Sequence, residues 1–193
     1  MGIEFELKYA ATPEVLSQLR QDFGQPEAVY SMQTTYFDTP SGALSALRYT
    51  LRQRMENGTC VSTVKIPLEG SARGEWECVC ASLNDAIAQV CAMGAPAQLL
   101  TLAGEGFVPV CGARFTRNCY TLATKDGFAE LALDEGILSG GGKEIPLFEL
   151  EVEHKTGNTR ETTCLAHALA EKYSLRPEPL SKFQRARRLA EGG

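Results

Sequence analysis

The stretch Ile3-Glu4-Phe5-Glu6-Leu7-Lys8-Tyr9 alternates hydrophobic and charged residues at every position. Because successive side chains of a β-strand point to opposite faces of the sheet, this pattern predicts a strand over residues 3–9. Glu4, Glu6 and Lys8 then share one face. Two carboxylates and an ammonium in one row can bind a hard cation beside a phosphate. The alternative, for this segment alone, is the solvated face of an edge strand.

The composition points to one ordinary globular domain. The 193 residues include 19 basic and 24 acidic side chains, and the net charge is −5. This charge gives no electrostatic case for a nucleic-acid duplex as partner. No apolar run is long enough for a membrane span, and the first residues lack the basic and apolar regions of a secretory signal. We therefore expect a single domain over residues 1–193, located in the cytoplasm and without a membrane partner.

The seven cysteines are scattered, and none of them forms a Cys-x-x-Cys pair. With His154 and His167 as the only histidines, the spacing does not favour a structural zinc site. We expect reduced, mostly buried thiols that fill gaps in the core and have no catalytic role.

Strand character recurs along the chain, and glycines mark the turns between strands. Glu56-Asn57-Gly58 and Lys125-Asp126-Gly127 have the composition of β-hairpin turns. The run Ser139-Gly140-Gly141-Gly142 is expected to form a flexible loop. The eight expected strands lie near residues 3–9, 29–38, 48–56, 60–66, 74–81, 114–122, 128–135 and 146–155.

Four helices are expected outside the strands. Thr12-Pro13-Glu14 provides an N-cap residue followed by proline, and Gly24 is placed to end that helix. A second helix is expected over residues 82–94 and a third over residues 159–173. Ser181-Lys182-Phe183-Gln184 fits the capping-box pattern of a last short helix.

Charges of one sign are grouped strand by strand. Arg52 and Arg54 share one face of a strand, Glu75 and Glu77 share a face of another, and residues 149–153 place three glutamates in a row. Crowded like charges are mildly destabilising unless groups of opposite sign lie between them. A polyanion facing the arginines and cations facing the glutamates would supply those groups. The pattern favours an α+β fold in which an eight-stranded antiparallel β-barrel forms a tunnel with a charged interior, covered outside by helices. A sandwich with one solvated face is the alternative.

A series of short motifs runs through the expected strands and the last helix. They are Glu4-x-Glu6-x-Lys8, Tyr36-Phe37-Asp38-Thr39-Pro40, Leu51-Arg52-Gln53-Arg54, Thr63-Val64-Lys65, Glu75 with Glu77, Arg117, Leu133-Asp134, Glu149-Leu150-Glu151 and Ser181-Lys182. Together these motifs make the chain similar to the CYTH superfamily, the triphosphate tunnel metalloenzymes. The resemblance implies an eight-stranded antiparallel tunnel. It also implies hydrolysis or cyclisation of a triphosphate-containing substrate with Mg²⁺ or Mn²⁺.

The resemblance implies roles for individual residues. Lys65 and Tyr36 would activate the attacking water together, as proposed in the thiamine triphosphatase branch, although Tyr36 reads equally well as a barrel aromatic. The triphosphate would be bound by Lys8, Arg52, Arg54, Lys65, Arg117 and Lys182. Arg185, three residues after Lys182, shares its helical face and is either a further phosphate contact or solvated surface. The metal would be held by Glu4, Glu6, Asp134, Glu149 and Glu151. Further tunnel carboxylates would be Glu75, Glu77, Glu130 and Glu153.

The expected function is metal-dependent hydrolysis of a triphosphate-containing small molecule, which is then the partner of the tunnel. The segment Phe148-Glu149-Leu150-Glu151-Val152-Glu153 resembles most the bacterial inorganic triphosphatases, which makes inorganic triphosphate the first candidate. The alternatives are a class IV adenylyl cyclase, a thiamine triphosphatase, and a non-catalytic protein that binds polyphosphate or nucleotide. The carboxylates argue against the last, because anion binding alone does not require them. A monomer and a homodimer are both compatible with the sequence.

Overall fold

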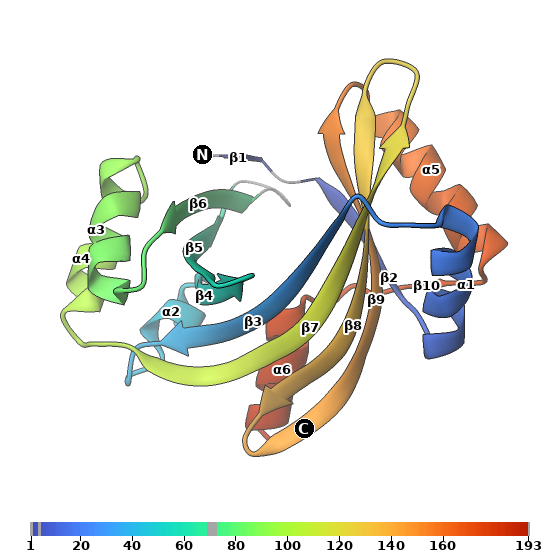
Figure 1. Cartoon of the computed structure of the whole chain (residues 1–193). Coiled ribbons are helices and arrows are strands. Elements are labelled where there is room, and N and C mark those ends of the chain that lie inside the picture. The colour runs from blue at the N-terminus through green and yellow to red at the C-terminus, as the bar shows by residue number, and fades with distance from the viewer. Residues whose placement is uncertain (1, 4, 69–72, 193) are drawn as a thin grey trace.

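One strongly curved antiparallel sheet of ten strands forms the centre of the molecule (Figure 1). The computed structural model describes residues 2–3, 5–68 and 73–192. The strands follow one another in the sheet in the order β1-β6-β5-β4-β3-β7-β8-β9-β2-β10. Their bounds are β1 (Gly2–Ile3), β2 (Glu6–Ala10), β3 (Ala28–Asp38), β4 (Thr50–Glu56), β5 (Thr59–Pro67), β6 (Arg73–Val79), β7 (Val108–Ala123), β8 (Phe128–Gly140), β9 (Lys143–Thr156) and β10 (Arg176–Pro177).

The N-terminal segment connects the two sides of the curved sheet. Gly2 in β1 lies opposite Glu75 in β6, whereas Glu6 in β2 lies opposite Glu153 in β9. The single strand expected over residues 3–9 is therefore wrong: the segment forms two short strands, because it leaves one side of the tunnel and pairs with the other. Among the described residues, the hydrogen-bonded ladder is open between β1 and β2, and the chain itself connects these two strands.

The other expected strands are present, and three of them are longer than expected. β7, β8 and β9 contain 16, 13 and 14 residues. Their added ends include glycine and proline, which are disfavoured in strands. Gly136 in β8 is needed there, because a Cβ atom would overlap the carbonyl oxygen of Arg114. The expected flexible loop is also wrong: Ser139 and Gly140 belong to β8, and Gly141-Gly142 forms a tight turn to β9.

The four expected helices are confirmed, and two short ones are added. α1 (Pro13–Phe23), α3 (Leu83–Ala92) and α5 (Thr159–Lys172) are capped by Thr12, Ser82 and Asn158. α6 (Lys182–Ala190) begins with the predicted capping box between Ser181 and Gln184. α2 (Ala43–Ala46) and α4 (Gln98–Ala103) were not expected, because helices of this length have too few residues to show a helical period.

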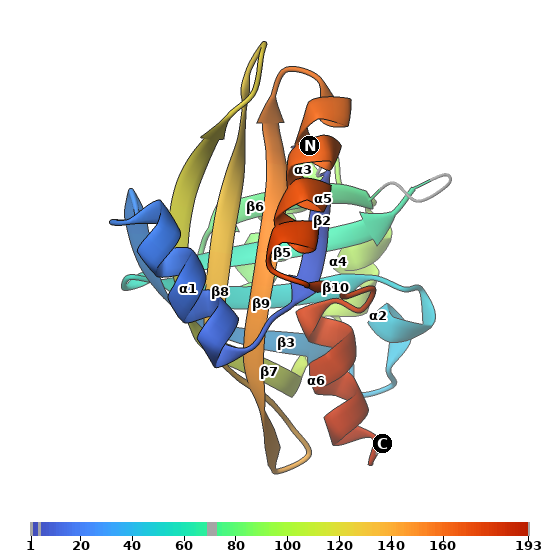
Figure 2. The same cartoon turned by 90° about the vertical axis from the view of Figure 1, so that its right-hand side faces the viewer.

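Two hydrophobic clusters lie between the outside of the sheet and these helices. α1 and α5 cover β2, β8 and β9 (Figure 2), and Leu131, Leu133, Leu150 and Val152 are completely buried beneath them. α2, α3 and α4 cover the other side around Trp76. This matches the expected arrangement, in which the apolar residues face outward and the charged ones inward.

The cover is incomplete over the middle of the sheet. Gln33, Arg114 and Thr116 lie exposed on the outer face of β3 and β7. The predicted helical cover is present on both sides of the sheet and stops at these strands, because their outward side chains are polar.

A third hydrophobic cluster lies inside the curve of the sheet. Ala186 of α6 packs against Ala113, Leu138 and Leu147, which line the inner face at one end. Gly140 allows this close packing, because a Cβ atom there would overlap the carbonyl oxygen of Ala186. α6 therefore closes one end of the tunnel.

The cysteines are all unpaired, as expected, but less buried than expected. Cys111 and Cys119 are buried, Cys164 is exposed, and the other four are half-buried. Within the described part of the chain, no helix is both long enough and apolar enough to cross a membrane.

Candidate active site

The strand register places the predicted charged residues on one face of the sheet. Side chains directly opposite one another in an antiparallel ladder point to the same side. The register therefore confirms the inward grouping that the alternating pattern predicted, except for Glu4, which lies outside the described residues. The opposed sets are Glu6–Glu153–Glu130, Lys8–Glu151, Glu149–Asp134–Arg117, Tyr36–Arg52–Thr63–Glu77 and Lys65–Glu75.

This inner face lines two adjoining cavities, which we call the narrow chamber and the wide chamber. Their volumes are about 110 Å³ and about 490 Å³. Arg52, Arg54 and Arg117 line both, so the chambers adjoin at these three side chains. The narrow chamber is also lined by Lys8, Lys65, Arg73 and Lys182, with Glu6 and Glu151 as its carboxylates. The wide chamber is also lined by Lys155 and by Glu56, Glu75, Glu77, Glu130 and Glu153.

The two chambers differ in charge. In the narrow chamber cationic side chains outnumber carboxylates, whereas in the wide chamber carboxylates slightly outnumber cations. An anion is therefore attracted most strongly to the narrow chamber, at the end closed by α6.

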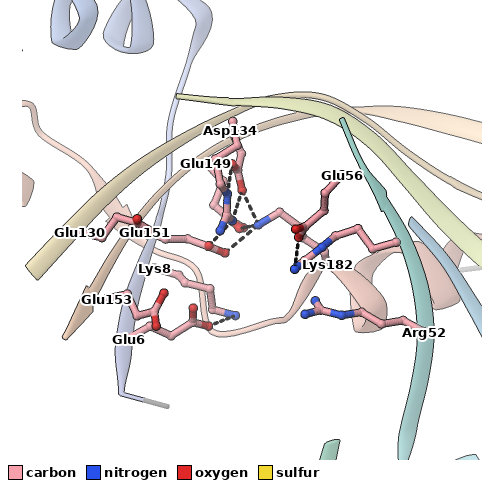
Figure 3. Close-up of polar contacts among 12 residues, drawn as sticks. Glu6, Lys8, Arg52, Glu56, Glu130, Asp134, Glu149, Glu151, Glu153 and Lys182 are labelled. Carbon is pink, nitrogen blue, oxygen red and sulfur yellow. Dashed lines mark hydrogen bonds and ion pairs between the residues drawn. The ribbon is translucent and has the colours of Figure 1, made fainter. Parts of the chain in front are cut away.

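Lys182 reaches from the first turn of α6 to three buried carboxylates (Figure 3). Its Nζ atom lies 2.8 Å from Oδ2 of Asp134 and 2.6 Å from Oε1 of Glu151, and it also pairs with Glu149. Arg185, on the same face of α6, pairs with Glu149 as well. The sequence placed these two cations on the phosphate. In this structure they contact the proposed metal ligands instead.

Asp134, Glu149 and Glu151 form a compact group, which we call the carboxylate trio. One oxygen from each lies within 4.8 Å of the others. Arg117 also contacts the trio, with its Nε and Nη2 atoms 2.8 and 2.7 Å from the two oxygens of Asp134 and with a further ion pair to Glu151. Three carboxylates at this spacing suit a hard divalent cation.

Glu6 lies outside the carboxylate trio. Its Oε1 atom is 3.9 Å from Nζ of Lys8, and it lines the narrow chamber. Of the five expected metal ligands, the structure thus brings three together and places Glu6 nearby on β2.

Burial and neighbouring charge shift the acidities of this group strongly. Burial raises the pKa of Glu149 to about 7, and the neighbouring Glu151 adds to this rise while Lys182 opposes it. Burial also acts to raise the pKa of Glu151, but Lys182 and Arg117 hold that pKa well below its usual range. For Lys182, burial acts to lower the pKa, and Asp134, Glu151 and Glu149 more than offset it, so its pKa is raised. The charged forms of these buried side chains are therefore stabilised by one another.

The guanidinium groups of Arg52 and Arg54 are incompletely satisfied. The Nε atom of each is buried and has no hydrogen-bond partner within the described structure. Arg52 has an Nη2 atom 3.6 Å from Glu75, and Arg54 pairs with Glu56. Burial and the neighbouring Arg52 lower the pKa of Arg54. A buried N–H without an acceptor costs about 1–3 kcal/mol, so these groups favour an anionic acceptor in the chamber.

Tyr36 and Lys65 both line the narrow chamber. The ring of Tyr36 packs on that of Phe183 in α6, with centroids 5.0 Å apart, and burial raises the pKa of its hydroxyl. The Nζ atom of Lys65 lies 3.3 Å from Glu75. Tyr36 therefore has a packing role beneath α6, and its hydroxyl stays protonated near neutral pH.

Three further charged residues belong to the tunnel although we did not predict them. Glu56, Arg73 and Lys155 line the chambers. Each continues an alternation already recognised in its strand, two residues from Arg54, Glu75 and Glu153 respectively. Extending the period-two pattern to the strand ends would have found them.

Ion pairs within the tunnel also explain the grouping of like charges along the strands, from which we inferred a bound polyanion. Arg54 pairs with Glu56, and Lys155 has its Nζ atom 2.8 Å from Glu153 and 3.6 Å from Glu130. Glu56 and Glu153 lie on the same strands as the cations they pair with, whereas Glu130 belongs to the neighbouring strand β8, so opposite charges come from the same strand as well as from adjacent ones. The grouping by sign does not by itself require a ligand.

Comparison with known proteins agrees with this architecture. The CYTH domain family matches residues 2–186. Among solved structures, a proposed adenylate cyclase from Bacillus halodurans is 19% identical over 95% of this chain and 96% of that chain, with a TM-score of 0.67. A proposed adenylyl cyclase from Hippeastrum, described as having a dominant triphosphatase activity, is 20% identical over 96% and 95%, with a TM-score of 0.67. The PH1819 protein of Pyrococcus horikoshii is 22% identical over 98% and 99%, with a TM-score of 0.64. At these identities the structures share the fold, and the family match shows that the chain belongs to the CYTH domain family.

Proposed function

We propose that this protein is a metal-dependent hydrolase of triphosphate-containing substrates, with inorganic triphosphate as the first candidate. One observation carries the proposal: Arg52 and Arg54 present buried, unpartnered Nε atoms in a narrow chamber lined mainly by cations. Buried guanidinium groups of this kind are suited to bidentate contacts with phosphate oxygens.

The chambers suggest how a substrate lies in the tunnel. The narrow chamber, of about 110 Å³, has room for little more than a phosphate chain, and its cations come from several strands and from α6. An organic group attached to the chain would extend into the wide chamber of about 490 Å³. The phosphates would be bound by Lys8, Arg52, Arg54, Lys65, Arg117 and Lys182, with Arg185 as a further contact from α6.

The carboxylate trio fits a divalent cation, Mg²⁺ or Mn²⁺, with Glu6 as a nearby additional ligand. Such an ion, when bound, would neutralise negative charge on the phosphate oxygens. Lys65 and Tyr36 would orient the attacking water in the narrow chamber. Because burial raises the pKa of Tyr36, its hydroxyl would donate a hydrogen bond there and would not take up a proton.

The CYTH structures with the same fold include proteins described as adenylate cyclases and one described as a triphosphatase. Cyclisation is the second candidate here, because the wide chamber adjoins the narrow one and offers room for a nucleoside.

An assay with tripolyphosphate, ATP and thiamine triphosphate, each with Mg²⁺ or Mn²⁺, tests the proposal. Phosphate release that stops on addition of EDTA supports it. Cyclic AMP formed from ATP without phosphate release would instead support the cyclase. Binding of tripolyphosphate with neither product would indicate a non-catalytic binding protein.

A further inference from the structure

The two cations of α6 occupy the position that a metal ion would need. Lys182 contacts all three members of the carboxylate trio, and Arg185 pairs with Glu149. The contacts are well shielded from water, since the side chains of Lys182 and Glu151 are each 10% exposed and those of Asp134 and Glu149 are fully buried. An ammonium at hydrogen-bond distance from the same oxygens excludes a metal ion from them.

The charges show what must leave when a metal ion binds. Arg117 belongs to the central strand β7 and pairs with Asp134 and Glu151 independently of α6. When all three carboxylates of the trio are ionised, as metal binding requires, Arg117 leaves two of their negative charges uncompensated. Lys182 and Arg185 supply two positive charges, which equals the charge of one divalent ion. One metal ion can therefore replace both side chains without changing the charge of the site.

A free metal ion and a metal–polyphosphate complex differ in what happens to the displaced cations. A free ion would leave Lys182 beside the basic narrow chamber without its carboxylate partners, and an unpaired buried charge is strongly unfavourable. Arg185 would keep only Glu178, whose Oε2 atom lies 3.6 Å from its Nη1 atom. The complex brings phosphate oxygens into the narrow chamber, where Lys182 is already a lining residue. Lys182 then has phosphate oxygens as new partners, and Arg185 follows it on the same face of α6.

We propose that Lys182 and Arg185 make this site selective for the metal complex of a polyphosphate over the free metal ion. In the empty protein they act as a resident counter-charge for the carboxylate trio. On binding of the complex, the metal takes the carboxylates and the phosphates take the two α6 cations. The inference rests on the proposed function for the position of the metal. It adds a second role for α6, which is to exclude the free metal ion, beside the binding of phosphate.

Metal titration without any polyphosphate tests this selectivity. Lys182→Met removes the competing ammonium and should bind Mn²⁺ about tenfold more tightly or better than the wild type, since the competitor is a buried paired charge. Arg188→Met is the matched control, because Arg188 lies exposed on the same helix and its loss changes the net charge equally. Its Mn²⁺ affinity should stay within about twofold of the wild type, as expected for an exposed charge. Lys182→Met binding Mn²⁺ no more tightly than the wild type would overturn the proposal.

Amide hydrogen exchange on the wild-type protein provides a test that needs no variant. Saturating Mn²⁺ alone should speed exchange in residues 182–190, because α6 loses its ion pairs. Mn²⁺ together with a hydrolysis-resistant imidotriphosphate should slow exchange there. Unchanged exchange in α6 at saturating Mn²⁺ would also overturn the proposal.

Neither experiment depends on turnover, so the two proposals can fail separately. Hydrolysis of tripolyphosphate with unchanged Mn²⁺ affinity in Lys182→Met would keep the proposed function and remove this inference. Tighter Mn²⁺ binding in that variant, without hydrolysis of any triphosphate by the wild type, would do the opposite.

Discussion

The Nζ atom of Lys182, at the start of the last helix, lies 2.8 Å from Oδ2 of Asp134 in the middle of the sheet. This contact ties the helix that closes the tunnel to the most buried carboxylates of the tunnel wall. The closing helix and the proposed metal site are therefore one electrostatic unit, and changes to either should be felt by the other.

The basic wall should be essential for binding the phosphate chain. Arg52→Ala and Arg54→Ala should each reduce kcat/KM for tripolyphosphate by at least about tenfold, because charge-assisted hydrogen bonds contribute roughly 1.5–3 kcal/mol. Arg114→Ala is the matched control, since Arg114 is an exposed arginine on the outer face of β7. Steady-state kinetics measure the effect. Unchanged kinetics in both inner variants would show that the tunnel does not bind the substrate.

Removing Lys182 should destabilise the empty protein. Asp134, Glu149 and Glu151 would keep their burial but lose their shared ammonium, and breaking a buried pair costs about 3–5 kcal/mol. Lys182→Met should therefore melt at a lower temperature than the wild type, and Arg188→Met should not. Tripolyphosphate should raise the melting temperature of the wild type more than that of Lys182→Met. An equal shift in both proteins would mean that Lys182 does not reach the bound phosphate.

The stability of the metal-free protein should vary with pH through Glu149. Burial raises the pKa of this carboxyl from its ordinary value of 4.5 to about 7, so the folded state holds a proton that the unfolded state has lost. This contribution is present below about pH 4.5 and is lost as the pH rises to about 7. Glu149→Gln should flatten the fall in unfolding free energy between these two pH values, measured by urea denaturation with a chelator present. If the free energy of unfolding fell as steeply in Glu149→Gln as in the wild type, the pH dependence would belong to another group.

Gly140 should be needed for the close packing of α6 on the sheet, and not only for the turn that follows it. A Cβ atom at Gly140 would overlap the carbonyl oxygen of Ala186, whereas a Cβ atom at Gly142 would meet nothing within 4 Å. Gly140→Ala should therefore weaken tripolyphosphate binding by displacing Lys182. Gly142→Ala strains the same turn, since φ is +75°, but should leave the affinity near that of the wild type. Isothermal titration of both variants separates the two effects, and equal affinities would exclude the positioning role.

The inner face could be predicted from the sequence because it depends on a local rule. Arg52 and Arg54, or Glu75 and Glu77, share a face by alternation alone, and the register then confirms that these faces meet. The predictions failed where distant segments decide the outcome. Gly136 and Gly140 read as breaks in strands, yet they lie within β8, where the backbone of β7 and the helix α6 approach too closely for a side chain.

The ion pairs across the tunnel could not be predicted from the sequence pattern either, because they also depend on segments that are distant in the sequence. Whether Lys182 contacts a phosphate or Glu149 depends on how α6 docks on the inner face, and nothing near Lys182 in the sequence encodes that. The division into a basic and an acidic chamber likewise depends on which strands face each other across the tunnel.

Metal-dependent hydrolysis in the tunnel is tested most directly by the initial rate of phosphate release from tripolyphosphate, measured with and without Mg²⁺ or Mn²⁺. Glu151→Gln, which replaces a buried member of the carboxylate trio by a poorer ligand, is compared with the wild type. We expect release by the wild type only when the metal is present, and a loss of nearly all of it in Glu151→Gln. Metal-independent release, or an equal rate in Glu151→Gln, would contradict this expectation.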